Sequence, residues 1–227
     1  MSHHESAAKG VDARLADRLL FFSDAVFAIV LTLLVFDIKL PPRAEGGAVA
    51  SDILSALHLV GPRLGTFLVS FLLVGGWWLI HTRVTRRLAQ FDGLTAICNF
   101  VFLLFITLMP FASSAFSGAV APAVGLEIYW GVNGLASLSL TLLFIVSSRG
   151  GGRLLSAPMQ RGEWGFRVAQ CVVPGIAFGI GVWGAAHEQY MVAQFCWILI
   201  FPLMALTRIF FRPPNEKPAA PPPPQPA

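Results

Sequence analysis

The chain has 227 residues, of which 56% are hydrophobic and only 12% carry a formal charge, with a net charge of +4. An average soluble domain has about 25% charged residues, and the mean hydropathy of this chain is +0.70. This composition excludes a disordered chain, a nucleic-acid-binding domain and an ordinary soluble enzyme, because a soluble fold cannot hide so much apolar surface from water. We expect an all-α integral membrane protein whose main partner is the lipid bilayer.

A helix needs about 20 mostly apolar residues to cross a bilayer core of about 30 Å. Six segments meet this requirement and predict transmembrane helices over residues 19–38, 62–80, 94–109, 124–147, 168–186 and 191–211. We expect Pro62 in the first turn of the second helix and Pro110 at the end of the third. Pro174 and Pro202 fall inside later helices, where neighbouring groups in a membrane protein can bond the freed carbonyls.

The basic residues predict the orientation of these helices. Of the 16 lysines and arginines, only Lys39, Arg43 and Arg63 fall on one side of the predicted membrane. The positive-inside rule therefore places both termini in the cytoplasm, which agrees with an even number of spans. The predicted organisation is a cytoplasmic segment over 1–17, a single six-helix unit over 18–211 and a disordered proline- and alanine-rich cytoplasmic tail over 212–227.

Polar side chains at membrane depth are energetically expensive and suggest either function or helix packing. The predicted topology brings several such residues and one tryptophan into a layer near the cytoplasmic ends of the first three helices. These residues are Arg18, Ser23, Asp24, Trp77, His81 and Asn99. We interpret the layer as a network that joins the three helices, with a proton or ion site at Asp24 as the alternative.

The chemistry of an enzyme or metalloprotein is not indicated. Cys98, Cys171 and Cys196 lie singly within apolar runs, which supports neither a disulfide framework nor a metal site. No serine or cysteine has a plausible catalytic base beside it. We expect no catalytic residue and no cofactor.

The first helix carries a candidate functional face. At 100° per residue, Ile29, Thr32, Leu33 and Phe36 fall on one stripe, and Asp24 points about 140° away from Ile29. A membrane helix is apolar all round, so this stripe alone is compatible with ordinary helix packing.

Three sequence segments resemble a known family. Residues 18–38 read RLLFFSDAVFAIVLTLLVFDI, residues 70–81 read SFLLVGGWWLIH, and residues 99–111 read NFVFLLFITLMPF. The pattern R-x-x-x-F-S-D, followed by A-V-F-A-I and T-L-L, resembles the first helix of the transmembrane protein 175 family of potassium channels. The single six-helix unit is similar to the bacterial and archaeal branch.

The resemblance implies a modestly selective, leak-like potassium channel in the plasma membrane of a prokaryote, with potassium as the permeant ion. It also implies a homotetramer in which the first helix of each subunit lines the pore. By position in the motif, Ile29 corresponds to the pore constriction, Thr32 to a hydroxyl layer beyond it, and Leu33 to the same lining. Arg18, Ser23, Asp24 and His81 correspond to residues of the family pattern at the cytoplasmic side.

Two positions depart from the family pattern. Phe36 stands one turn beyond the constriction, where an aliphatic residue is expected, and four such rings would narrow the outer half of the pore. Thr82 follows His81, where many members have a second histidine.

Two other functions remain open at this point. One is a proton-coupled secondary transporter that uses Asp24 and His81 as a relay, and the other is a non-conducting membrane scaffold.

Overall fold

The computed structural model describes residues 2–38, 53–152, 154–157, 159 and 162–210. Within these ranges the structure is all-α, and six segments are long and apolar enough to cross a membrane, which confirms the predicted spans. They are Ala16–Phe36, Val60–Thr85, Gly93–Gly118, Pro122–Ser147, Glu163–Ala186 and Tyr190–Phe210. The predicted tail over 212–227 lies outside the described residues.

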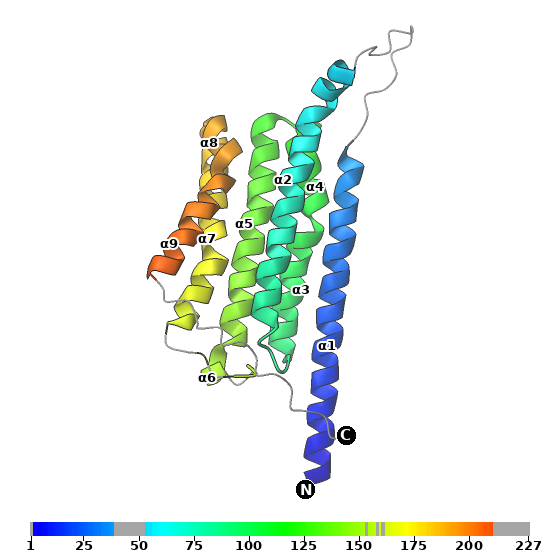
Figure 1. Cartoon of the computed structure of the whole chain (residues 1–227), viewed down its shortest axis with the longest axis vertical. Coiled ribbons are helices and arrows are strands. Elements are labelled where there is room, and N and C mark those ends of the chain that lie inside the picture. Colours follow the sequence, from blue (N-terminus) through cyan, green and yellow to red (C-terminus); the bar gives the residue numbers. More distant parts are fainter. Residues whose placement is uncertain (1, 39–52, 153, 158, 160–161, 211–227) are drawn as a thin grey trace, which may run out of the picture.

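The helices form an up-and-down bundle (Figure 1). The helix α5 lies between α3 and α7, while α1 packs against α2 and α3 at one side, and α8 and α9 pack against α7 at the other. The helical elements in chain order are α1 (Ser2–Leu33), η1 (Leu34–Asp37), α2 (Ile53–Thr85), α3 (Gly93–Thr107), α4 (Met109–Ser114), η2 (Ala115–Ala119), α5 (Pro122–Ser147), α6 (Arg149–Gly152), α7 (Glu163–Ala186), α8 (Tyr190–Phe195), η3 (Cys196–Leu199) and α9 (Ile200–Phe210).

The helices differ from the sequence-based expectation at three prolines. Pro62 lies inside α2, which begins at Ile53, so the expected first-turn position is wrong. The helix α3 ends at Thr107, but the third span restarts as α4 beyond Leu108, because Pro110 has no N–H to donate to an earlier carbonyl. The same loss at Pro202 accompanies the 3₁₀ turn η3 within the sixth span.

Aromatic side chains fill the centre of the bundle. The ring of Trp130 on α5 stacks on Phe178 of α7, with ring centroids 5.4 Å apart. Trp77 on α2 meets Phe178 at 6.1 Å and the edge of Phe102 on α3 at 6.4 Å. Four helices are therefore held together by one continuous aromatic cluster, which is buried from both lipid and water.

Charged and polar contacts join the connecting segments at the end of the bundle where α2 and α5 finish. The carboxylate of Glu163 is fully buried; it forms an ion pair with Arg87 Nη1 at 2.7 Å and accepts a hydrogen bond from Arg167 Nε at 2.9 Å. Ala89 N–H donates to the carbonyl oxygen of Leu154 at 2.9 Å. These contacts tie the turn after α2 to the start of α7.

The start of α3 is fixed at the same end of the bundle. Asp92 Oδ1 accepts a hydrogen bond from the backbone N–H of Thr95 at 2.9 Å, and Asp92 also forms an ion pair with Arg149. Hydrogen bonding to Thr95, followed by the nearby charge of Arg149, lowers the pKa of the Asp92 carboxyl below its ordinary value. Asp92 is therefore a charged helix cap at neutral pH.

Replacing Gly125 by alanine should destabilise the protein by about 2 kcal/mol, because added atoms in a tight contact force their neighbours apart. A Cβ atom at Gly125 on α5 would overlap the backbone carbonyl oxygen of Ala115. Gly131 on the same helix is the matched control, because a Cβ there meets nothing within 4 Å. Chemical unfolding in mixed micelles, followed by circular dichroism, should show loss of stability for G125A alone; equal effects of the two variants would contradict this packing.

Candidate functional site

The helix α1 has one face packed against the bundle and one exposed face. Ser23, Phe27 and Val30 are buried, as is Leu34 at the start of η1, and this face packs against α2 and α3. The spacing of three or four residues is that of a single helical stripe. On the side away from this stripe, Ile29 and Leu33 are exposed.

All four residues proposed from the sequence as pore-lining lie on the exposed side. Ile29 is 57% exposed, Leu33 43% and Phe36 73%, and Thr32 is also exposed. The hydroxyl of Thr32 donates to the Ile29 carbonyl oxygen at 2.7 Å. Phe36 lies in the 3₁₀ turn η1 and not in α1 itself. The four side chains are thus available to whatever lies beside α1.

A buried hydrogen-bonded network joins α1, α2 and α3 near one end of the bundle. His81 Nε2 and Asn99 Oδ1 are 2.8 Å apart, and Asn99 Nδ2 donates to Ser23 Oγ at 3.0 Å. Ser23 Oγ in turn donates to the Leu19 carbonyl oxygen at 2.9 Å. Because an amide oxygen only accepts, His81 Nε2 carries the hydrogen and donates it to Asn99.

Aromatic rings enclose this network. The imidazole of His81 stacks on Phe102 with ring centroids 5.2 Å apart, and Phe27 of α1 lies 5.7 Å from the imidazole on centroid distance. His81 is 1% exposed, and Asn99 is fully buried. Removing either polar group would leave its partner without a hydrogen bond in an apolar site, which is unfavourable.

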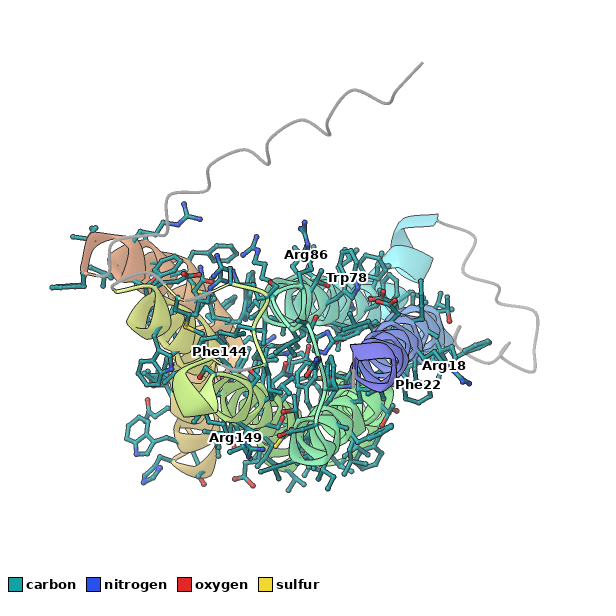
Figure 2. All side chains as sticks on the ribbon, turned by 90° about the horizontal axis from the view of Figure 1, so that it is seen from below. Arg18, Phe22, Trp78, Arg86, Phe144 and Arg149 are labelled. Atoms are coloured by element: carbon teal, nitrogen blue, oxygen red, sulfur yellow. The ribbon has the colours of Figure 1, made fainter. Side chains whose placement is uncertain are left out.

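The structure brings together only part of the layer expected from the sequence. Asp24 lies on the exposed side of α1 and accepts a hydrogen bond at 2.9 Å from Trp78 Nε1. Trp77 instead donates to Asn133 Oδ1 on α5 at 3.1 Å. Arg18 is exposed and lies on the outer side of α1, away from the bundle (Figure 2).

Sequence reasoning overlooked two groups of polar residues. Trp78 and Asn133 are the hydrogen-bond partners of Asp24 and Trp77, and the adjacency of the two tryptophans was the available signal. In the other half of the bundle, Ser70 Oγ lies 2.8 Å from Tyr129 Oη and donates to Ser113 Oγ at 3.2 Å. Isolated serines in apolar segments have no spacing that predicts such a contact.

The site has two parts: a buried hydrogen-bonded network that joins three helices, and an exposed face of α1 with apolar and hydroxyl side chains. No group of three or more histidine, cysteine, aspartate or glutamate side chains that could hold a metal ion occurs among the described residues. The cysteines Cys98, Cys171 and Cys196 are buried and unpaired by disulfides.

Comparison with known proteins connects this region to a family of ion channels. Residues 18–110 match the family described as endosomal/lysosomal potassium channel TMEM175. A potassium channel from Streptomyces collinus is 29% identical over 123 residues, which cover 54% of this chain and 58% of the relative. A potassium channel from Chamaesiphon minutus is 34% identical over 97 residues, covering 43% of this chain and 47% of the relative.

A vertebrate relative matches a stretch of similar length. The endosomal/lysosomal proton channel TMEM175 of Gallus gallus is 34% identical over 100 residues, or 42% of this chain and 20% of the relative. The matched sequence spans about half the length of the bacterial relatives.

The fold extends the likeness beyond the matched sequence. The crystal structure of a lysosomal potassium-selective channel TMEM175 homolog from Chamaesiphon minutus superposes with a TM-score of 0.72, at 21% identity, over 86% of this chain and 98% of that one. The family match covers residues 18–110, which hold most of the first three spans, so this chain resembles the TMEM175 family in that part of its sequence and has the fold of the Chamaesiphon minutus homolog over most of its length.

Proposed function

We propose that this chain is a potassium-permeable cation channel whose pore is enclosed by the first helices of four identical subunits. Ile29 forms the narrowest apolar ring, and Thr32, Leu33 and Phe36 line the route beyond it. The channel lies in the plasma membrane of a prokaryote with both termini in the cytoplasm. The potassium-channel descriptions of the Streptomyces and Chamaesiphon relatives support the permeant ion.

The observation that carries this proposal is the uneven burial of α1. One face is packed into the subunit, while the face with Ile29, Thr32 and Leu33 is exposed in the second half of the span. A homo-oligomer with closed symmetry puts the same exposed residue at one height in every subunit. Four copies of this face around an axis make alternating apolar and hydroxyl rings.

The physical mechanism follows from the chemistry of these rings. Four isoleucine side chains form an apolar collar that excludes water, and a dehydrated ion is energetically costly there. The Thr32 hydroxyl donates its hydrogen to the Ile29 carbonyl, so its oxygen lone pairs remain available to a cation. Opening requires the first helices to move apart slightly.

The proposal is tested by ion flux from purified protein in liposomes, together with the mass of the oligomer in detergent. We expect potassium flux above sodium flux, and a mass of four subunits. If the tetramer carries protons but no potassium, the permeant ion is the proton, as named for the vertebrate relatives. Absence of flux from a folded tetramer would support a scaffold, and a monomer would overturn the pore.

The transporter alternative makes a different prediction for Asp24. This carboxylate lies on the exposed side of α1 and bonds Trp78, whereas His81 is buried among Asn99 and aromatic rings. We therefore expect D24N to keep channel flux for each folded tetramer. Saturable, pH-driven flux that D24N abolishes without loss of assembly would favour the transporter.

Replacing Thr32 by alanine should reduce the preference for potassium over sodium by a few-fold, because a methyl group offers no oxygen to the ion. The reversal potential under potassium against sodium gradients measures this change. Thr107 on α3 is the matched control, because it is also exposed and its hydroxyl donates to a carbonyl three residues earlier, that of Leu104, at 2.8 Å. The same shift in T107A, or an unchanged reversal potential in T32A, would exclude the role of Thr32.

A further inference from the structure

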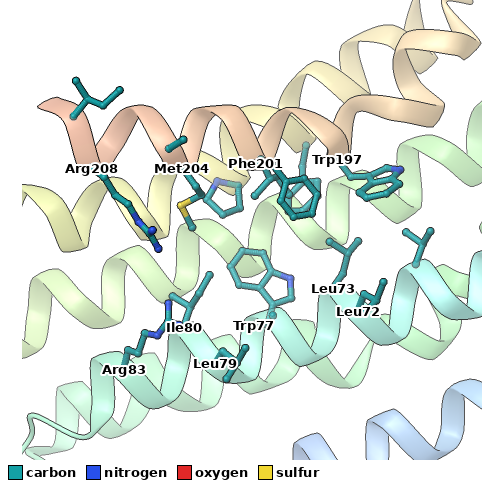
Figure 3. Close-up of a pocket in the computed structure, with 17 residues that line it drawn as sticks. Leu72, Leu73, Trp77, Leu79, Ile80, Arg83, Trp197, Phe201, Met204 and Arg208 are labelled. Carbon is teal, nitrogen blue, oxygen red and sulfur yellow. The ribbon is translucent and has the colours of Figure 1, made fainter. Parts of the chain in front are cut away.

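An apolar groove of about 780 Å³ runs between α2 and α9, and α7 forms its floor (Figure 3). Leu72 and Leu79 of α2 and Phe201 of α9 line its walls. Pro174 and Phe178 of α7 also line it, and Trp197 lies at one end. The groove lies on the opposite side of α2 from α1, and it is separate from the exposed face of α1.

The groove exists because α9 packs along α7 and not against α2. Large apolar side chains of both walls therefore remain uncovered: Leu72 is 68% exposed and Phe201 is 67% exposed. Both lie within the membrane spans Val60–Thr85 and Tyr190–Phe210. Lipid chains are the natural neighbours of such side chains at this depth.

Charge is confined to one end of the groove. Among the residues that line it, the only charged side chains are Arg83 and Arg208, in the last turns of α2 and α9. Figure 3 shows them at the same end, with their guanidinium groups turned toward each other across the groove. Neither forms an ion pair with another described residue. The charged end is therefore set up for an anion at the boundary of the membrane.

We propose that this groove binds an anionic glycerophospholipid, with the phosphate between Arg83 and Arg208 and an acyl chain along the apolar walls. Arginine binds phosphate through paired N–H donors, and the two guanidinium groups give the site a positive charge without a carboxylate in the lining. A zwitterionic lipid brings an ammonium group toward the same arginines and is less favoured. The inference does not depend on whether the chain conducts ions.

Trp197 can report on occupancy of the groove. The purified protein is reconstituted in vesicles of phosphatidylglycerol and phosphatidylcholine at fixed ratio, with brominated acyl chains on only one of the two lipids. The variant W197F isolates the fluorescence of this tryptophan by subtraction. We expect stronger quenching when the bromine is on phosphatidylglycerol.

A basic residue near the membrane surface strengthens the binding of an anionic lipid about fivefold. R83Q and R208Q should therefore each reduce the preference for phosphatidylglycerol over phosphatidylcholine by about that factor.

Arg86 provides the matched control. It is an exposed arginine just after α2, outside the groove lining, so R86Q removes the same charge near the same end of the bundle. We expect R86Q to keep the preference for phosphatidylglycerol within twofold. Equal losses in R86Q and R83Q would overturn the site in favour of general surface attraction.

Other occupants give different results, and each would overturn the proposal. A second copy of the chain seated in the groove would shield Trp197 from both brominated lipids. A site for free phosphate alone would lose its preference when inorganic phosphate is added in excess. Native mass spectrometry gives an independent readout: the wild-type protein should retain phosphatidylglycerol from mixed micelles, and the R83Q/R208Q double variant should not.

Discussion

Replacing Ile29 by asparagine should raise potassium flux into liposomes by at least about tenfold, since lowering a barrier by ~1.4 kcal/mol gives that factor. In the proposed tetramer, four amide side chains replace the apolar ring, and water and ions then enter the constriction more readily. Flux is compared per assembled tetramer, so that a change in the amount of protein does not enter the result.

Ile176 is the matched control for this substitution. It is 51% exposed, compared with 57% for Ile29, and lies in the middle of the span Glu163–Ala186. The variant I176N introduces the same polar group at similar membrane depth on a helix that does not belong to the proposed pore. Unchanged flux in I29N, or an equal increase in I176N, would rule out Ile29 as the gate.

Replacing Glu163 by glutamine should lower the free energy of unfolding by about 3 kcal/mol, because removing one member of a buried ion pair leaves the opposite charge uncompensated. Glu163 is fully buried and holds both Arg87, which follows α2, and Arg167 on α7. Glutamine keeps the volume and one acceptor oxygen but loses the charge. Chemical denaturation in mixed micelles measures the difference.

Glu127 offers a matched comparison on α5. It is half-buried and forms no ion pair with a described residue. E127Q should therefore change stability by no more than about 0.5 kcal/mol, the range of ordinary surface substitutions. If E163Q were as stable as E127Q, the ion pairs of Glu163 with Arg87 and Arg167 would not be what holds α7 to the turn after α2.

The six spans could be predicted because membrane thickness imposes a length on every apolar segment. The positions at which the helices break could not be predicted as well from the sequence. Pro62 and Pro110 carry the same sequence signal, yet α2 continues through the first, whereas the helix breaks beside the second. The difference depends on how the surrounding turns pack, which a local pattern does not contain.

The candidate site could also be predicted only in part from the sequence. Ser23, His81 and Asn99 were correctly expected together, because their depths along three adjacent helices place them at one height. Trp77 was expected in this layer, but it bonds Asn133, and its neighbour Trp78 bonds Asp24, since a step of one residue along a helix changes a side chain's direction by about 100°. Depth follows from counting residues, whereas rotation follows from the packing of neighbours.

The direction of the hydrogen bonds through Asn99 has a consequence for proton movement. The donors run from His81 to Asn99, from Asn99 to Ser23, and from Ser23 to a backbone carbonyl. A carboxamide nitrogen holds its hydrogens and does not exchange them in the way that water or imidazole does. Asn99 therefore interrupts proton hopping between the imidazole of His81 on α2 and the hydroxyl of Ser23 on α1.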